Sequence, residues 1–358
     1  MRLRKNHLWV IVAVVVIAGG IVTALLLRRG APPDAVRLLP DSDAALYINL
    51  GPIRLLTDLG KNPPKERDPQ YDDFVRQTGF EFERDLDRAA FAIHYASSGA
   101  TNSETRYSEI LQGHFDSARV SDYLHKLAAR VDRYDQYDIY VIPLEGRTVR
   151  VALLGVDTAA ASNVDDPKVL EGMIDRYKQA ALPFSGPALV RQYYRRVPIG
   201  SMVWTIARPP RSSTSDHGEL LVPGGWSALL PANSVVVASA RPLHDVHLRA
   251  DVLMTSDSAA QKFTEQVATY LTLFKSLEIS MDSGGPDKDV KAAFDSLEVH
   301  QDKSEASLTA SVPYAFFKKI LSEPPVQLGP EPPRQSEPEP PAAAGKQPPA
   351  ANGKHKNK

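Results

Sequence analysis

The chain has 358 residues, 43% of them hydrophobic, and a formal net charge of −1 from 42 basic and 43 acidic residues. It contains no cysteine, which excludes a disulfide scaffold, a thiolate metal site and a cysteine nucleophile. The charges are segregated, because residues 1–29 carry five bases and no acid whereas residues 30–322 carry 32 bases against 39 acids. An acidic body is a poor counterion for phosphates, so the composition argues against a nucleic-acid-binding protein.

Residues 8–27 form an apolar run that predicts a membrane-spanning helix. The run holds twenty residues without a charge, and as a helix it would extend about 30 Å, the thickness of a hydrocarbon core. The alternative is a cleaved signal peptide, but the run exceeds the usual ~7–15 apolar residues and ends in Arg28 and Arg29 instead of a small-residue cleavage site. We therefore expect an uncleaved anchor. The bases before the run outnumber those after it, which predicts that residues 1–7 are a basic cytoplasmic segment and that the body lies outside the cytoplasm.

The first half of the body shows the alternating pattern of β-strands. A run at 38–50 predicts the first strand, and the runs at 88–96 and 105–115 predict two more. Strands at 137–142 and 148–156 are close enough in sequence to form a hairpin. Short hairpins favour an antiparallel sheet.

Apolar stripes with helical spacing lie between these strands. Short helices are predicted around Leu55 and Leu56 and around Phe74 and Val75. The clearest stripe follows Asp116 or Ser117 as the cap and consists of Val120, Leu124, Leu127, Ala128 and Val131. A further helix is predicted to open at Asp166 and Pro167, an acid in the capping position followed by a first-turn proline.

The same order of elements recurs about 140 residues later. The predicted elements are a strand at 246–254, a helix capped by Ser256 and Asp257, a short helix at 290–297, a hairpin of 297–301 and 305–312, and a helix that begins at Pro313. We therefore predict an α+β fold of two related units, 35–208 and 226–322, joined by a linker loop at 209–225. Each unit is expected to be an antiparallel sheet with helices against one face.

Residues 323–358 hold ten prolines and almost nothing apolar to bury. Such a composition cannot offset the entropy of ordering the chain, so we predict a disordered Pro-rich tail. Its basic end, residues 354–358, could touch an anionic polymer or simply be solvated.

The sequence has no motif that identifies a reaction or a cofactor. It lacks a phosphate loop, a dinucleotide fingerprint, HExxH and GxSxG, so we assign no catalytic, cofactor-binding or metal-binding residue. His244 and His247, with Asp245 between them, are the residue types that zinc or iron needs. On a strand this spacing would point the two rings to opposite faces, whereas on a turn they could converge.

Other residues with chemical potential have a structural explanation beside the functional one. His94 is expected in the core, and Asp116 as a helix cap explains the position of His114. The carboxylates cluster at element boundaries, where turns and caps use them: Asp41 and Asp43; Asp85 and Asp87; Asp132, Asp135 and Asp138; and Asp282, Asp287 and Asp289. The stretch that ends at Asp157 resembles the acidic strand end of a nucleotide hydrolase, but the phosphate loop that would accompany it is missing. Two aromatic groups fit a binding surface or an amphipathic core: Tyr134, Tyr137 and Tyr140, and Tyr193, Tyr194, Arg195 and Arg196.

An anchor followed by LLPDSDAALYINL (38–50), then ILQGHFDSARVSDYLHKLAARVDRYDQYDIYVIP (110–143) and VHLRADVLMTSDSAAQKFTEQV (246–267), resembles the uncharacterised bacterial single-pass envelope proteins that join one anchor to a domain of unknown function. The resemblance implies a bacterial source and an extracytoplasmic body on the inner membrane.

Three functions remain open from the sequence. The first is a binding or structural module of the envelope, with the membrane and an envelope protein or the cell wall as partners. The second is an extracytoplasmic hydrolase with a metal at His244 and His247. The third is a carrier that holds an apolar ligand between the sheet and its helices.

Overall fold

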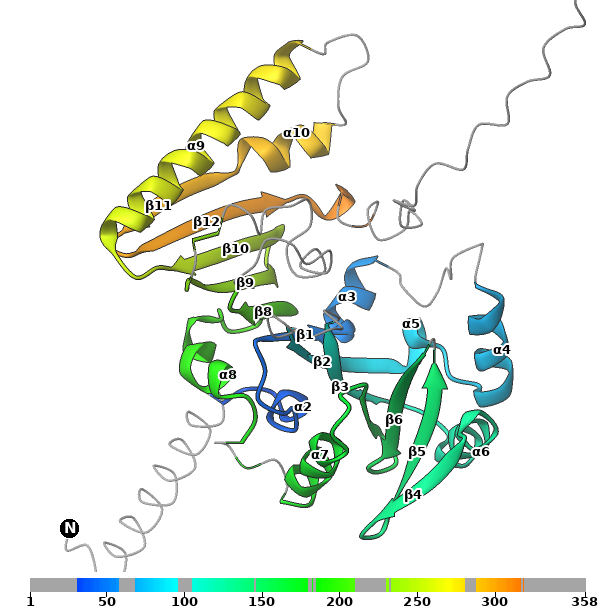
Figure 1. Cartoon of the computed structure of the whole chain (residues 1–358). Coiled ribbons are helices and arrows are strands. Elements are labelled where there is room, and N and C mark those ends of the chain that lie inside the picture. Colours follow the sequence, from blue (N-terminus) through cyan, green and yellow to red (C-terminus); the bar gives the residue numbers. More distant parts are fainter. Residues whose placement is uncertain are drawn as a thin grey trace, which may run out of the picture. The chain divides into compact units, whose positions relative to one another are not determined.

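The computed structural model describes residues 31–57, 68–95, 105–144, 146–179, 182, 185–209, 230–231, 233–280, 288–316 and 318 (Figure 1). The expected basic segment at 1–7, the anchor at 8–27 and the Pro-rich tail at 323–358 lie outside these residues, as does the linker at 209–225 except for Pro209. Within the described ranges, no helix is both long enough and apolar enough to cross a membrane.

The described strands form one twelve-stranded sheet in which every neighbouring pair is antiparallel. The order across the sheet is β11-β12-β10-β9-β8-β1-β2-β3-β7-β6-β5-β4. The strands are β1 Ala44–Asn49, β2 Leu86–His94, β3 Arg106–Gly113, β4 Arg130–Tyr134, β5 Tyr137–Leu144, β6 Arg147–Leu153, β7 Thr158–Ser162, β8 Val203–Ala207, β9 Val235–Pro242, β10 Val246–Leu253, β11 Glu298–Asp302 and β12 Glu305–Val312. The predicted α+β class and antiparallel pairing are confirmed, but the expectation of two separate sheets is wrong.

The two halves of this sheet repeat one order of strands outward from their junction. β1 and β8 pair with each other at the centre, and outward from them lie first β2 or β9 and then β3 or β10, each antiparallel to its neighbour. One helix follows β3 and two follow β10. The chain then returns through the meander β4–β7 in the first half and the hairpin β11–β12 in the second, and the last strand, β7 or β12, pairs with β3 or β10. The two halves form one sheet because β1 and β8, the innermost strand of each half, pair with each other.

Helices cover both faces of the sheet. We call the face that carries Ile110, Ile139 and Ala160 the α7 face. Its core is packed against three helices and a 3₁₀ turn: α2 Asp34–Arg37, α7 Lys168–Lys178, α8 Ala188–Tyr193 and the turn Tyr194–Arg196. Leu170 and Met173 of α7 are fully buried there.

The opposite face, which carries Leu111, Tyr140 and Val151, is called the α6 face. Its helices are α3 Leu50–Thr57, α4 Pro69–Thr78, α5 Phe82–Asp85, α6 Ser117–Leu127, α9 Asp257–Ser280 and α10 Lys288–Asp295. In Figure 1, α9 and α10 lie alongside β11 and β12. The expectation that helices lie against only one face is therefore wrong. The physical reason is visible at 139–141 of β5, where three consecutive residues are buried because both sides of the strand are covered.

Helix α6 begins where its cap predicts and ends earlier than its apolar stripe predicts. Asp116 accepts hydrogen bonds from the backbone N–H groups of Ala118 and Arg119 at 3.0 and 3.2 Å. The chain becomes extended at Ala128, so Val131 lies on β4 and not on the helix. Beyond Pro313, residues 314–316 and 318 are helical, as expected.

Candidate functional site

An apolar cavity of about 260 Å³ lies between the α6 face of the sheet and helices α4, α5 and α6. Four phenylalanines form much of its wall, namely Phe74 of α4, Phe82 of α5, and Phe80 and Phe115 from the loops before α5 and α6. The remaining described lining consists of aliphatic side chains of β2, β3, β6, β7 and α6 and of Glu109 on β3. Together these residues define the apolar cavity discussed below.

The helical part of the wall follows from the sequence pattern. Val120 and Leu124 lie one turn apart on α6 and turn the same side of the helix toward the sheet. Phe74 of α4 meets Phe80, Phe82 and α6, with ring centroids 6.2 and 5.6 Å from those of Phe80 and Phe82. Aromatic pairs at these distances add stability beyond that of their buried area, so the three phenylalanine rings stabilise one another in the cavity wall.

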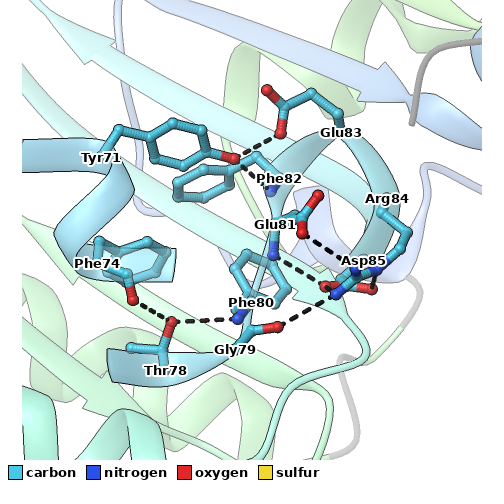
Figure 2. A network of polar contacts seen from close by, with 10 residues as sticks. All are labelled: Tyr71, Phe74, Thr78, Gly79, Phe80, Glu81, Phe82, Glu83, Arg84 and Asp85. Carbon is cyan, nitrogen blue, oxygen red and sulfur yellow. Dashed lines mark hydrogen bonds and ion pairs between the residues drawn. The ribbon is translucent and has the colours of Figure 1, made fainter. Parts of the chain in front are cut away.

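Polar contacts fix the turn from α4 to α5 that carries these rings (Figure 2). Gly79 ends α4 in the left-handed conformation with φ of 73°, where a side chain would be strained. The Thr78 hydroxyl donates to the Phe74 carbonyl at 2.7 Å and accepts from the Phe80 N–H at 3.2 Å. Tyr71 connects the other side of the turn, because its hydroxyl accepts from the Phe82 N–H at 3.0 Å.

Arg84 and Asp85 of α5 form hydrogen bonds with each other and with the same turn. The guanidinium of Arg84 donates to both carboxylate oxygens of Asp85 at 2.7 Å and to the carbonyl of Gly79 at 3.2 Å. Burial alone would raise the pKa of Asp85, but hydrogen bonds from Arg84 and from the Glu81 N–H, at 2.8 Å, lower it below its usual value. The Asp85 carboxylate is thus stabilised in its ionised form. These hydrogen bonds fix the turn that carries Phe80 and Phe82, and Thr78, Arg84 and Asp85 themselves are not part of the cavity lining.

Glu109 is the one ionisable side chain among the described residues that line the apolar cavity. It lies in the middle of β3, directly opposite Phe91 of β2 and Ala161 of β7. Within the described ranges, its carboxylate has no hydrogen-bond or ion-pair partner. Burial raises the pKa of the Glu109 carboxyl, because an apolar surrounding disfavours its charged form.

Glu109 also borders a second hollow, of about 280 Å³, on the same face. We call it the outer hollow; it is lined by Phe91, Tyr107, Glu109, Val149, Ala161, Ser162 and Asn163. Glu109 and Ala161 belong to both spaces. The Glu109 side chain therefore lies between the apolar cavity and the outer hollow, which is the more polar of the two spaces.

The histidine pair considered from the sequence does not assemble a metal site. His244 and His247 are both exposed, and the Nδ1 atom of His247 is 3.4 Å from the Ser311 hydroxyl. Within the described ranges, no three His, Cys, Asp or Glu side chains come together as metal ligands would. His247 lies on β10, whereas His244 lies in the turn between β9 and β10.

The two other histidines considered from the sequence, His94 and His114, have structural partners. Burial lowers the pKa of His94, whose Nε2 lies 3.5 Å from the Ser108 hydroxyl. His114 is exposed, and its Nδ1 is 3.2 Å from the Asp87 carboxylate. Asp116 caps α6, as predicted.

The aromatic groups that suggested a binding surface belong largely to the core. Tyr134 and Tyr137 pack on the α7 face, where the Tyr134 hydroxyl donates to Asp175 at 3.0 Å. Tyr140 is buried on the α6 face and shares a hydrogen bond of 2.7 Å with Ser121.

The second group divides between core and solvent. Tyr193 and Tyr194 pack against the core of the α7 face, whereas Arg195 is exposed. Arg196 pairs with Glu305 of β12 at 2.5 Å. Amphipathicity of a short helix therefore explains this group better than a binding role.

Most of the described carboxylate clusters serve turns and ion pairs. Asp41 accepts from the Ala188 N–H at 2.6 Å, and Asp43 accepts from the Tyr95 N–H at 3.0 Å. The remaining contacts are Asp87 with Arg54, Asp132 with Arg130, Asp135 with Lys178, and Asp157 with Thr158. Asp282 and Asp287 lie outside the described residues.

Sequence reasoning did not identify the cavity or Glu109. A signal for Glu109 was present, because Tyr107, Glu109 and Leu111 alternate along one predicted strand and place a carboxylate in phase with two apolar side chains. The aromatic wall gave no comparable signal, since Phe80 and Phe115 lie in loops between elements.

Comparisons with known proteins give a distant likeness only. No family model matches the chain, and no curated protein matches it. Three crystal forms of TP0453 are similar to it in structure. Form III has a TM-score of 0.46 at 9% identity and covers 81% of this chain and 98% of that chain. Form I has a TM-score of 0.40 at 10% identity, covering 82% and 98%, and form IV has 0.38 at 11%, covering 81% and 96%.

Proposed function

We propose that this chain is a membrane-anchored binding module of the bacterial envelope, and that its extracytoplasmic body holds a small apolar ligand in the apolar cavity. The observation that carries the proposal is the cavity itself, a space of about 260 Å³ whose lining is hydrocarbon except for one carboxylate. The space is partly open, so a ligand can reach it, and an apolar ligand that enters would remove both its own surface and the apolar lining from water. The anchor supports a location at the membrane, where apolar compounds concentrate.

The volume limits the size of the ligand. A cavity of roughly 150 Å³ already admits benzene, whereas pockets for drug-sized molecules begin at about 300 Å³. A single short hydrocarbon chain or a small ring system therefore fits, and a whole two-chain lipid does not. Since the chain lacks a reaction motif, and its histidine pair is exposed without a third ligand among the described residues, binding is favoured over metal-dependent hydrolysis.

A thiol-protection experiment tests the proposal in the full-length chain, because the protein has no cysteine of its own. Val120→Cys places one thiol in the cavity wall, and the chain is held in nanodiscs of zwitterionic lipid. We expect octanol to slow the reaction of this thiol with a small alkylating reagent at least several-fold. A cysteine at Val156, whose side chain is 80% exposed and outside the cavity lining, serves as the control.

The companion variant Ala161→Leu fills part of the cavity and should abolish protection by octanol in the Val120→Cys background. If octanol leaves the reaction rate of the cavity thiol unchanged up to its solubility limit, the cavity is not a ligand site. Equal slowing at Val156→Cys would show that octanol acts on the reagent or the membrane, and would also overturn the proposal.

A further inference from the structure

The outer hollow has the chemistry of a site for a cation. Two aromatic side chains, Phe91 and Tyr107, line it together with Glu109. Phe91 is directly opposite Glu109 across the β2–β3 pair, and Tyr107 precedes Glu109 by two residues on β3, so all three belong to the α6 face. An ammonium group is attracted both to a carboxylate and to the faces of aromatic rings.

Neither space offers a counter-charge to an anion. Among the described residues, those that line the apolar cavity and the outer hollow include no Lys, Arg or His. The basic residues nearest in sequence, Arg106 and Arg150, contact other groups, since Arg106 pairs with Asp165 at 3.1 Å and Arg150 donates to the Val164 carbonyl at 2.9 Å. An acidic head group beside Glu109 would therefore meet the negative charge of its carboxylate and no basic side chain of the described lining.

Glu109 is half-buried and has no hydrogen-bond or ion-pair partner among the described residues. A carboxylate that is partly removed from water is unfavourable unless it is paired or hydrogen-bonded. A ligand that brings a positive charge and N–H donors would supply the missing partner, and Glu109 would hold it at the mouth of the apolar cavity.

We propose that the site takes a single-chain amphiphile with an ammonium head group. The hydrocarbon chain occupies the apolar cavity, and the ammonium group lies in the outer hollow against Glu109, Phe91 and Tyr107. This inference rests on the proposed function, because it names the class of ligand for the same cavity.

The test compares three probes with the same octyl chain in the Val120→Cys protection assay, namely octylammonium, octanol and octyl sulfate. At equal free concentrations and pH 7, octylammonium should give half-maximal protection at a concentration about ten-fold or more below that of octanol, as expected for one charge-assisted hydrogen bond. Octyl sulfate should protect less well than octanol. Zwitterionic nanodiscs keep the membrane from favouring either charge.

The variant Glu109→Gln in the same background removes the charge and keeps the shape. It should abolish the advantage of octylammonium over octanol while protection by octanol remains. The head-group proposal is overturned if octylammonium protects no better than octanol, or if its advantage persists in Glu109→Gln. Failure of octanol itself to protect the thiol would instead overturn the proposed apolar site, so the two failures are distinguishable.

Discussion

Tyr47 of β1 and Trp204 of β8 lie directly opposite each other in the sheet, with stacked rings whose centroids are 5.6 Å apart. Tyr194 contacts the same indole, at a centroid distance of 5.4 Å. These rings sit on the α7 face at the strand pair through which the two halves of the sheet are joined. The junction is therefore a packed aromatic core and not a pair of backbones held only by ladder hydrogen bonds.

Replacing Trp204 tests whether the two halves fold as one. Trp204 is 2% exposed, and truncation of a buried Trp typically removes about 3–5 kcal/mol of stability. We expect Trp204→Ala to lower the free energy of unfolding by this amount while urea unfolding, followed by circular dichroism, remains a single transition. Tyr270→Ala on α9, where the ring is 40% exposed, is the control and should change stability by less than ~1 kcal/mol. A split into two transitions in Trp204→Ala would show that the halves fold independently.

The sequence predicts best those elements whose side chains alternate or form a stripe. The cap at Asp116 and the hairpin of β5 and β6 appear as expected. β7 was missed, because its sequence, TAAAS, consists of small residues with no contrast between the two faces. It is a strand only because β3 and β6 pair with it on either side, which is a tertiary effect. β4, β8 and β9 were missed as well. β8 is short, and β9 opens with three consecutive valines that do not alternate.

Gly113 allows β3 and the end of α5 to approach each other closely. A Cβ atom built at this glycine would lie 2.3 Å from the Asp85 carbonyl oxygen and 2.9 Å from the Leu86 Cα, beside the irregularity in the β2–β3 pairing. We expect Gly113→Ala to lower stability by about 1–3 kcal/mol, because backbone atoms have to move. Gly172→Ala, within α7, meets no atom closer than 3.5 Å and should raise stability by up to ~1 kcal/mol. Urea unfolding of both variants gives the comparison, and a stable Gly113→Ala protein would contradict the close approach.

Glu109 should make the protein less stable as the pH rises. Burial raises the pKa of its carboxyl in the folded chain above the ordinary 4.5. Between that value and the folded-state pKa the folded protein binds more protons than the unfolded chain, so stability falls as pH rises through this window and then levels off. We expect Glu109→Gln to raise the melting temperature at pH 7 and to leave it unchanged near pH 3, where the glutamate is neutral in both states.

Glu265→Gln on the exposed side of α9 is the matched control for this pH comparison, and its effect should be small at both pH values. Equal melting temperatures for Glu109→Gln and the unaltered chain at pH 7 would show that the carboxylate has a partner in solution. A stabilising substitution at a cavity position is typical of a site retained for binding at the expense of stability.

The candidate site could not be predicted from the sequence, because its residues come together only when β7 pairs with β3 on one side and with β6 on the other. Leu111 and Val151 are separated by forty residues and line one cavity because β7 inserts between their strands. No spacing in the sequence indicates that insertion. The carboxylate at position 109 was visible as a charged residue in phase with apolar ones, yet its missing partner is a property of the folded chain.

The location of the body is the remaining prediction, and the absence of cysteine again makes it testable. The bases before the apolar run outnumber those after it by a narrow margin, which predicts that the amino terminus lies in the cytoplasm and the rest of the chain outside. With Ser336→Cys, we expect a membrane-impermeant maleimide to label the chain in intact spheroplasts as fully as in lysed cells. Protection until lysis would invert the topology and place the cavity in the cytoplasm. The ligand would then have to be an apolar compound of the cell interior, and an envelope partner would be excluded, whereas the cavity chemistry around Glu109 would be unaffected.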